Sequence, residues 1–150
     1  MARVQLLDVN VLVALFDPDH IHHEPAHDWF SDHREHGWAT CPLTENGFVR
    51  VITHPRYRAD PPRLVVAARQ LRQFCASGDH HFWNDTPSLR DEDAFSLGSL
   101  RGPAQVTDVY LLALAVQMKG TLVTFDRTIP LAAVHGASRD AIAVIAPASE

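Results

Sequence analysis

Short apolar runs alternate along the chain with longer segments in which apolar residues recur every three or four positions. Short apolar runs between turn signals are typical of buried strands, and the longer spacing is typical of helices that pack one face on a core. Strands are predicted at 4–7, 38–41, 81–83, 121–125 and 141–145. Helices are predicted at 9–16, 22–36, 43–53, 63–76, 91–100 and 106–118. Because strands alternate with helices, the pattern predicts an α/β fold with a mostly parallel sheet covered on both faces.

The chain is expected to form a single domain over residues 1–150. It has no internal repeat, no low-complexity tract and no long linker, and 150 residues is the size of an ordinary domain. The segment 54–63 is the most loop-like, with three prolines in ten residues, but it is too short to separate two domains.

The composition of the chain argues against several classes of protein. No apolar run approaches the roughly 18 residues of a membrane-spanning helix, and the first residues do not resemble a secretory signal. The two cysteines, Cys41 and Cys75, fit a reducing environment, so a cytoplasmic protein without membrane contact is expected. The net charge of -5 argues against a general nucleic-acid-binding module, and no direct DNA binding is expected. It argues less against a nuclease whose acidic site is neutralised by metal ions.

Four acidic residues lie where the predicted elements would bring their side chains to one edge of the sheet. Asp8 and Asp126 directly follow predicted strands, whereas Glu45 and Asp108 lie at predicted helix starts. Thr44 is the expected N-cap of the helix that contains Glu45. A helix that follows a parallel strand begins at the carboxyl edge of the sheet, which is also where ligands bind in such folds. The four acids can therefore converge on one rim.

Each of these acids also has a purely structural explanation. Acids in a first helical turn interact favourably with the helix dipole, which suffices for Glu45 or Asp108 alone, and an aspartate after a strand is often a turn residue, as for Asp126. Asp8 and Asp108 are harder to explain, because apolar residues surround both and a buried charge needs compensation. Two such acids favour a shared cation, and hard oxygen ligands favour Mg²⁺ or Mn²⁺ over zinc.

Divalent ions bound by carboxylates are suited to the hydrolysis of phosphodiesters. Such ions polarise the phosphodiester, generate a nucleophile from bound water near neutral pH and stabilise negative charge on the attacked and leaving oxygens. No protein nucleophile is required.

The four acids lie in short motifs that together carry a family resemblance. The motifs are Leu6-Leu7-Asp8-Val9-Asn10-Val11-Leu12, Pro42-Leu43-Thr44-Glu45 followed by Arg50, Thr107-Asp108 within an apolar helix, and Thr124-Phe125-Asp126-Arg127. In this order and spacing they resemble the PIN-domain family, and in particular the VapC toxins of bacterial type II toxin–antitoxin pairs. The resemblance extends over about residues 4–146.

The resemblance implies a three-layer α/β/α fold with a central parallel sheet. It implies a Mg²⁺- or Mn²⁺-dependent endoribonuclease that acts on RNA, forms a homodimer and is inhibited by a cognate VapB antitoxin. Asp8 and Asp108 would then be the principal metal ligands. Glu45 would complete the site directly or through water, and Asp126 would hold a second metal or orient water. The residues that would support these acids by hydrogen bonds are Asn10, Thr107 and Thr124.

The remaining polar and aromatic residues have simpler explanations. His23 and His27 lie four apart and could chelate zinc on one helix face, but no HExxH pattern or paired cysteines accompany them. His80-His81 is expected to be a loop feature. Solvated arginines are favoured over RNA contacts at Arg56, Arg58, Arg63, Arg101 and Arg127. The core is the favoured location for Trp29, Trp38 and Trp83.

Four rival interpretations are weaker. A phosphatase would have a second aspartate two residues after the first, where this chain has Asn10, and a receiver domain would place a lysine beside the acids, whereas Lys119 ends a helix. A PIN-type nuclease acting on DNA or structured nucleic acid is a closer rival, although such enzymes are usually longer. A non-catalytic interaction domain is disfavoured because all four acids are present.

Overall fold

The computed structural model describes residues 2–147 and contains, within them, one five-stranded sheet with the strand order β3-β2-β1-β4-β5. Every neighbouring pair of these strands is parallel. The strands are β1 (Gln5–Leu7), β2 (Trp38–Thr40), β3 (His80–Phe82), β4 (Thr121–Thr124) and β5 (Ile142–Val144). Each overlaps a segment predicted as a strand, so the predicted parallel sheet is confirmed.

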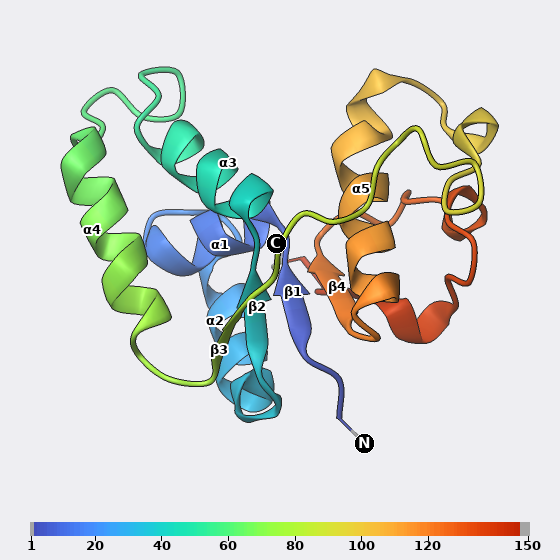
Figure 1. Cartoon of the computed structure of the whole chain (residues 1–150). Coiled ribbons are helices and arrows are strands. Elements are labelled where there is room, and N and C mark those ends of the chain that lie inside the picture. Colours follow the sequence, from blue (N-terminus) through green and yellow to red (C-terminus); the bar gives the residue numbers. More distant parts are fainter. Residues whose placement is uncertain (1, 148–150) are drawn as a thin grey trace.

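Helices cover both faces of this sheet (Figure 1). The α-helices of residues 2–147 are α1 (Val9–Phe16), α2 (His23–His33), α3 (Pro42–Ile52), α4 (Leu64–Cys75) and α5 (Val106–Gln117). The first four pack on one face and α5 packs on the other, which confirms the three-layer fold. In this part of the chain no helix is both long and apolar enough to cross a membrane.

The two faces of the sheet bury separate apolar cores, because successive side chains of a strand point to opposite faces. Leu6 and Leu122 belong to the core under α5, while Leu7 and Val123 belong to the core shared by α1 to α4. All four side chains are fully buried. Strands buried on both faces read as continuous apolar runs, which is why β1 and β4 were visible in the sequence.

The helix predicted at 91–100 is wrong. Most of this segment forms turns, with a short 3-10 turn near its end. Phe95 forms an isolated antiparallel bridge with Val134, and the Ser96 amide donates to the Ala133 carbonyl at 2.8 Å. Partners almost forty residues away in sequence therefore satisfy backbone groups that a helix would have paired locally.

Two smaller predictions near the sheet are also wrong. Helix α3 begins at Pro42 with Cys41 as its N-cap, so Thr44 lies inside the first turn, where its hydroxyl accepts a hydrogen bond from the Cys41 amide at 2.9 Å. His80 and His81 are not loop residues, because they open β3 and pair with β2. Both differences change which residues surround Glu45.

Candidate active site at the carboxyl edge of the sheet

Asp8 lies where β1 ends, at the carboxyl edge of the sheet and beside β4. Its amide donates to the Val123 carbonyl at 3.0 Å, which continues the β1–β4 register by one residue. The Thr124 hydroxyl donates to Asp8 Oδ2 at 2.8 Å. The Val9 amide donates to Asp8 Oδ1 at 2.7 Å, which makes Asp8 the N-cap of α1. Only 5% of Asp8 is exposed, and this burial raises the pKa of its carboxyl group despite both hydrogen bonds.

Asp126 follows β4 by two residues, and the loop after the strand holds it in its ionised form. Its Oδ1 accepts from the Thr128 hydroxyl at 2.6 Å and from the Thr128 amide at 2.7 Å. These hydrogen bonds lower the pKa of Asp126. The Asp126 amide donates to the Thr124 hydroxyl at 3.1 Å. One threonine hydroxyl therefore contacts both the carboxylate of Asp8 and the backbone of Asp126.

Asp108 reaches the other two aspartates from the first turn of α5. Its pKa is raised to about 7, first by burial, then by the negative charges of Asp8 and Asp126, and by a hydrogen bond with Asp126 that favours the protonated form of Asp108. Three carboxyl groups from separate segments of the chain thus act on one another. We refer to Asp8, Asp108 and Asp126 as the aspartate cluster.

The aspartate cluster has more negative charge than the surrounding protein compensates. None of the ion pairs formed within residues 2–147 includes one of its members. The negative charge of neighbouring carboxylates raises the pKa of a carboxyl group unless a cation lies between them, as the shift at Asp108 illustrates. Carboxylate oxygens are the ligands that Mg²⁺ and Mn²⁺ prefer, and Mg²⁺ usually binds through one or two carboxylates together with several waters. The carboxylate donors and the absence of an ion pair therefore fit a divalent cation, and the ligand atoms of the three aspartates do not all lie within 4.8 Å of one another in this structure.

Glu45 lies in the first turn of α3, but its carboxylate has different neighbours. The Thr40 hydroxyl, at the end of β2, donates to Glu45 Oε2 at 2.7 Å and also contacts His80 Nε2 at 2.7 Å. Ligand atoms of Glu45, Cys75 and His80 lie within 4.8 Å of one another, the one such group of histidine, cysteine and acidic side chains among the described residues. The four predicted acids are therefore divided between the aspartate cluster and this second group.

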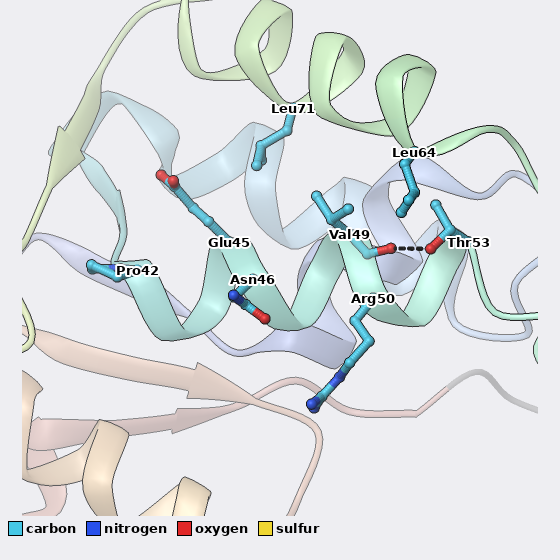
Figure 2. A pocket seen from close by; sticks show the side chains of 8 residues that line it. All are labelled: Pro42, Glu45, Asn46, Val49, Arg50, Thr53, Leu64 and Leu71. Carbon is cyan, nitrogen blue, oxygen red and sulfur yellow. Dashed lines mark hydrogen bonds between the residues drawn. The ribbon is translucent and has the colours of Figure 1, made fainter.

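A pocket of about 650 Å³ lies between α3 and α4 and is lined in part by Glu45 (Figure 2). Its apolar walls include Val49 of α3 and Leu71 of α4. In Figure 2 the Glu45 side chain extends from α3 toward α4, whereas Arg50 extends away from α4. Ions and other ligands can therefore reach the Glu45 carboxylate from solvent through this pocket.

Residues 6–134 match the family model of the PIN domain. The chain belongs to the PIN-domain family. Ribonuclease VapC44 of Mycobacterium tuberculosis is 47% identical over 140 residues, which cover 93% of this chain and 98% of the relative. From the same organism, Ribonuclease VapC38 is 47% identical over 121 residues, covering 81% and 84% of the two chains. Ribonuclease VapC39 is 38% identical over 131 residues, covering 87% and 94%. These similarities place this PIN domain among the VapC proteins and confirm the resemblance found in the motifs.

Of the three residues expected to support the acids of this PIN domain by hydrogen bonds, Thr124 forms such bonds within residues 2–147 and the other two do not. Thr124 is fully buried and bonds to Asp8 and Asp126. Asn10 and Thr107 have exposed side chains in the first turns of α1 and α5. Neither forms a side-chain hydrogen bond with any residue of the described range, so a supporting role for these two stays a prediction.

Sequence reasoning missed several residues that shape the site. Thr128, two residues after Asp126, matches the spacing of a common side-chain turn and could have been recognised. Thr40 had no signal of its own. Cys75 and His80 are five residues apart across Gly78, but nothing in the sequence indicated that Glu45 would lie beside them.

Two of the three tryptophans of this PIN domain lie in the core as predicted, and His23 contacts the backbone of a neighbouring helix. His23 Nδ1 lies 2.7 Å from a backbone carbonyl of α1, and neither His23 nor His27 belongs to a potential metal-binding group within residues 2–147. Trp38 and Trp83 are buried in the two cores. Trp29 is only half-buried, so it is not a core residue in the strict sense.

Proposed function

We propose that this VapC protein is the toxin of a type II toxin–antitoxin pair and a metal-dependent endoribonuclease. The observation that carries the proposal is the aspartate cluster, in which three carboxyl groups from the ends of β1 and β4 and from α5 interact at the carboxyl edge of the sheet and form no ion pair with a basic side chain of residues 2–147. The ribonuclease names of its relatives support RNA as the substrate. Hydrolysis of an RNA phosphodiester by an activated water is the reaction proposed.

The aspartates would have distinct roles. Asp8 and Asp108 would be the principal ligands of Mg²⁺ or Mn²⁺, with Glu45 completing the site directly or through water and Asp126 holding a second ion or orienting water. When bound, such an ion supplies an activated water and neutralises the negative charge that develops on the phosphodiester. Mg²⁺ and Mn²⁺ are proposed over zinc for the aspartate cluster because all its ligands are carboxylate oxygens.

The residues of the chain prepare this site before an ion or RNA arrives. Thr124 orients Asp8 by donating to Oδ2, and Thr128 keeps Asp126 ionised through two hydrogen bonds. Asp108, whose pKa is about 7, changes its charge within the neutral pH range. The buried backbone around β1 and β4 holds these groups in fixed positions, as a catalytic site requires.

The partners proposed follow from the VapC family. They are an RNA substrate, a second copy of the chain in a homodimer, and a cognate VapB antitoxin that inhibits cleavage. Size-exclusion chromatography with light scattering would measure the dimer directly, and co-expression with the antitoxin would measure inhibition.

The test of the proposed function is removal of one charge from the cluster. Asp8→Asn and Asp108→Asn keep side-chain shape but remove a carboxylate ligand, and each should lower Mg²⁺-dependent cleavage of total RNA at least a hundredfold, an estimated loss of about 3 kcal/mol of transition-state stabilisation. Circular dichroism should show a folded protein in both cases. Asp93→Asn is the matched control, because Asp93 is an exposed aspartate of a surface turn.

The proposal would be overturned by metal-independent cleavage that persists at the wild-type rate in the Asp8→Asn/Asp108→Asn double variant. Equal loss of cleavage in Asp93→Asn would also count against it, because the effect would then not be specific to the cluster. Mapping the new RNA ends after expression would identify the RNA that is cut.

A further inference from the structure

The group formed by Glu45, Cys75 and His80 differs in ligand chemistry from the aspartate cluster. It combines a carboxylate oxygen, a thiol sulfur and an imidazole nitrogen, all within 4.8 Å of one another. Thiolate and imidazole ligands favour zinc and similar transition metals, whereas Mg²⁺ and Mn²⁺ favour oxygen ligands. The mixture therefore selects a different ion from the one that fits the aspartates.

The spacing of the three side chains is close to that of a zinc site. Zinc binds sulfur at about 2.3 Å and imidazole nitrogen at about 2.0–2.1 Å, so two ligands of one tetrahedral ion lie about 3.3–3.8 Å apart. The ligand atoms of the group lie within 4.8 Å of one another, and all three residues are half-buried. Three protein ligands leave the fourth position for water, and one of the three, Glu45, also lines the pocket of Figure 2.

Thr40 already orders two of the three side chains. Its fully buried hydroxyl donates to Glu45 Oε2 and contacts His80 Nε2, both at 2.7 Å. Because the hydroxyl proton is used on the carboxylate, the contact with His80 requires a proton on Nε2, which leaves Nδ1 of the neutral ring with a free lone pair. Partners of this kind orient histidines in metal sites.

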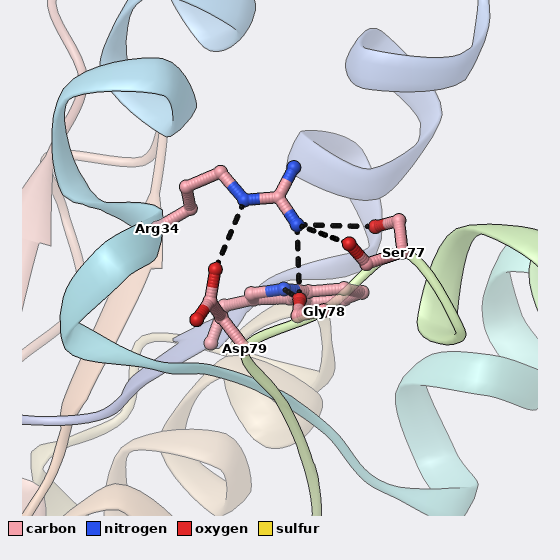
Figure 3. Close-up of polar contacts among 5 residues, drawn as sticks. Arg34, Ser77, Gly78 and Asp79 are labelled. Atoms are coloured by element: carbon pink, nitrogen blue, oxygen red, sulfur yellow. Dashed lines mark hydrogen bonds and ion pairs between the residues drawn. The ribbon is translucent and has the colours of Figure 1, made fainter.

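Arg34 forms hydrogen bonds with the turn that joins Cys75 to His80 (Figure 3). Arg34 Nη2 donates to the Gly78 carbonyl at 2.9 Å, and its Nε donates to Asp79 Oδ2 at 3.4 Å. Gly78 and Asp79 both have positive φ angles, of 112° and 63°, so the chain reverses tightly between the two potential ligands. The relative position of the end of α4 and the start of β3 is thereby fixed.

We propose that Glu45, Cys75 and His80 form a zinc site that regulates the nuclease by retaining Glu45 beside Thr40. The regulatory part rests on the proposed function, in which Glu45 completes the catalytic metal site. Zinc bound by these three residues engages the Glu45 carboxylate and withholds it from the aspartate cluster. Cleavage of RNA is therefore reduced by zinc even when Mg²⁺ is abundant.

Cobalt substitution of the full chain tests the site independently of cleavage. Co²⁺ bound to a thiolate gives a sulfur-to-cobalt charge-transfer absorption that carboxylate ligands do not produce. We expect this absorption to saturate at one equivalent in the wild type, to be abolished by zinc, to vanish in Cys75→Ser and to weaken at least tenfold in apparent affinity in His80→Gln. His81→Gln is the matched control, because His81 is an exposed neighbour on the same strand.

The Asp8→Asn/Asp108→Asn double variant separates this site from the aspartate cluster. It should retain the cobalt absorption at wild-type affinity, although it has lost two carboxylates of the cluster. Absence of the absorption in the wild type, or its persistence in Cys75→Ser, would overturn the zinc site.

The regulatory part is tested by comparing cleavage with and without stoichiometric zinc in excess Mg²⁺, each variant against itself. Zinc should reduce cleavage at least tenfold in the wild type and in His81→Gln, and less than threefold in Cys75→Ser and His80→Gln. Equal inhibition of all four proteins would overturn the regulation, because zinc would then act at the aspartates. A wild type that cleaves no RNA would overturn the proposed function, and the cobalt absorption would still decide the zinc site.

Discussion

At the scale of single residues, the hydroxyl of Thr124 connects two members of the aspartate cluster. It is buried, donates to the carboxylate of Asp8 and accepts from the amide of Asp126. A hydrogen bond to an ionised carboxylate stabilises the charged form, so Thr124 opposes the effect of burial on the pKa of Asp8. Thr124 therefore lowers the pKa of Asp8 against the larger, opposite effect of burial.

Thr124→Val should lower cleavage about tenfold at neutral pH, because loss of a hydrogen bond to a charged group costs about 1.5–3 kcal/mol. The pKa of Asp8 rises further in this variant, so the deficit should shrink as pH increases. The pH profile of cleavage measures this effect. Thr124→Ser keeps the hydroxyl and should follow the wild type. A Thr124→Val profile that coincides with the wild-type profile would show that the hydroxyl has no such role.

The raised pKa of Asp108 has a consequence for stability in the absence of metal. The folded protein holds the Asp108 proton up to a pKa of about 7, whereas an unfolded chain releases it near 3.8. Between these values the folded state binds more protons than the unfolded state, so stability falls as pH rises and the loss is complete above pH 7 or so. The contribution of the Asp108 carboxyl group to the free energy of unfolding is thus fully present only at acidic pH.

In chelator, the free energy of unfolding of the wild type should therefore decrease from pH 5 to pH 8 more than that of Asp108→Asn. The expected difference is about 1–2 kcal/mol, after a discount for the partial exposure of Asp108. Urea unfolding at the two pH values measures it. Identical changes in the two proteins would contradict the raised pKa of Asp108. Mg²⁺ should restore stability chiefly at pH 8, where Asp108 is ionised.

At the scale of elements, the turn between α5 and β4 sets where the aspartate cluster forms. Helix α5 carries Asp108 and the strand after it leads to Asp126, and the reversal between them passes through Lys119, with φ of 56°, and Gly120. A β-carbon on Gly120 would lie 2.5 Å from the ring of Trp83 and 2.6 Å from the carbonyl oxygen of Val4. Close approach of backbone to the sheet requires glycine there.

Gly120→Ala should therefore destabilise the protein by about 1–3 kcal/mol, the usual cost of overpacking a well-packed site. Urea or thermal unfolding measures the change. Gly98→Ala is the control, since a β-carbon on Gly98 would meet no atom within 4 Å. Equal stability of Gly120→Ala and wild type would show that the turn can move away from Trp83.

At the scale of the whole molecule, the proposed function requires that the protein be harmful without its antitoxin. Wild type expressed alone should slow growth and translation, and co-expression of the cognate VapB should restore both. Asp8→Asn/Asp108→Asn should be tolerated at equal protein levels, measured by immunoblot. Normal growth with abundant wild-type protein and no antitoxin would contradict the toxin assignment.

The sequence by itself was sufficient to predict the parallel sheet and the edge of the sheet on which Asp8 and Asp126 lie. Runs such as 4–7 and 121–125 are apolar throughout because both faces of their strands are buried, and that pattern depends only on local composition. Residues at the ends of parallel strands share one edge, so Asp8 and Asp126 could be placed together before their distances were known. The helix at 91–100 was wrong because its backbone partners, near Val134, are distant in sequence.

Only the tertiary structure decided which of the four acids act on one another. Interaction of Asp8, Asp108 and Asp126 depends on the β1–β4 register and on how α5 packs on the sheet, and neither is encoded in a local pattern. The direction of the Glu45 side chain depends on Thr40 and on the fastened turn before His80, which lie on other elements. Burial and neighbouring charge set the pKa of each carboxyl group, and both are properties of the folded chain.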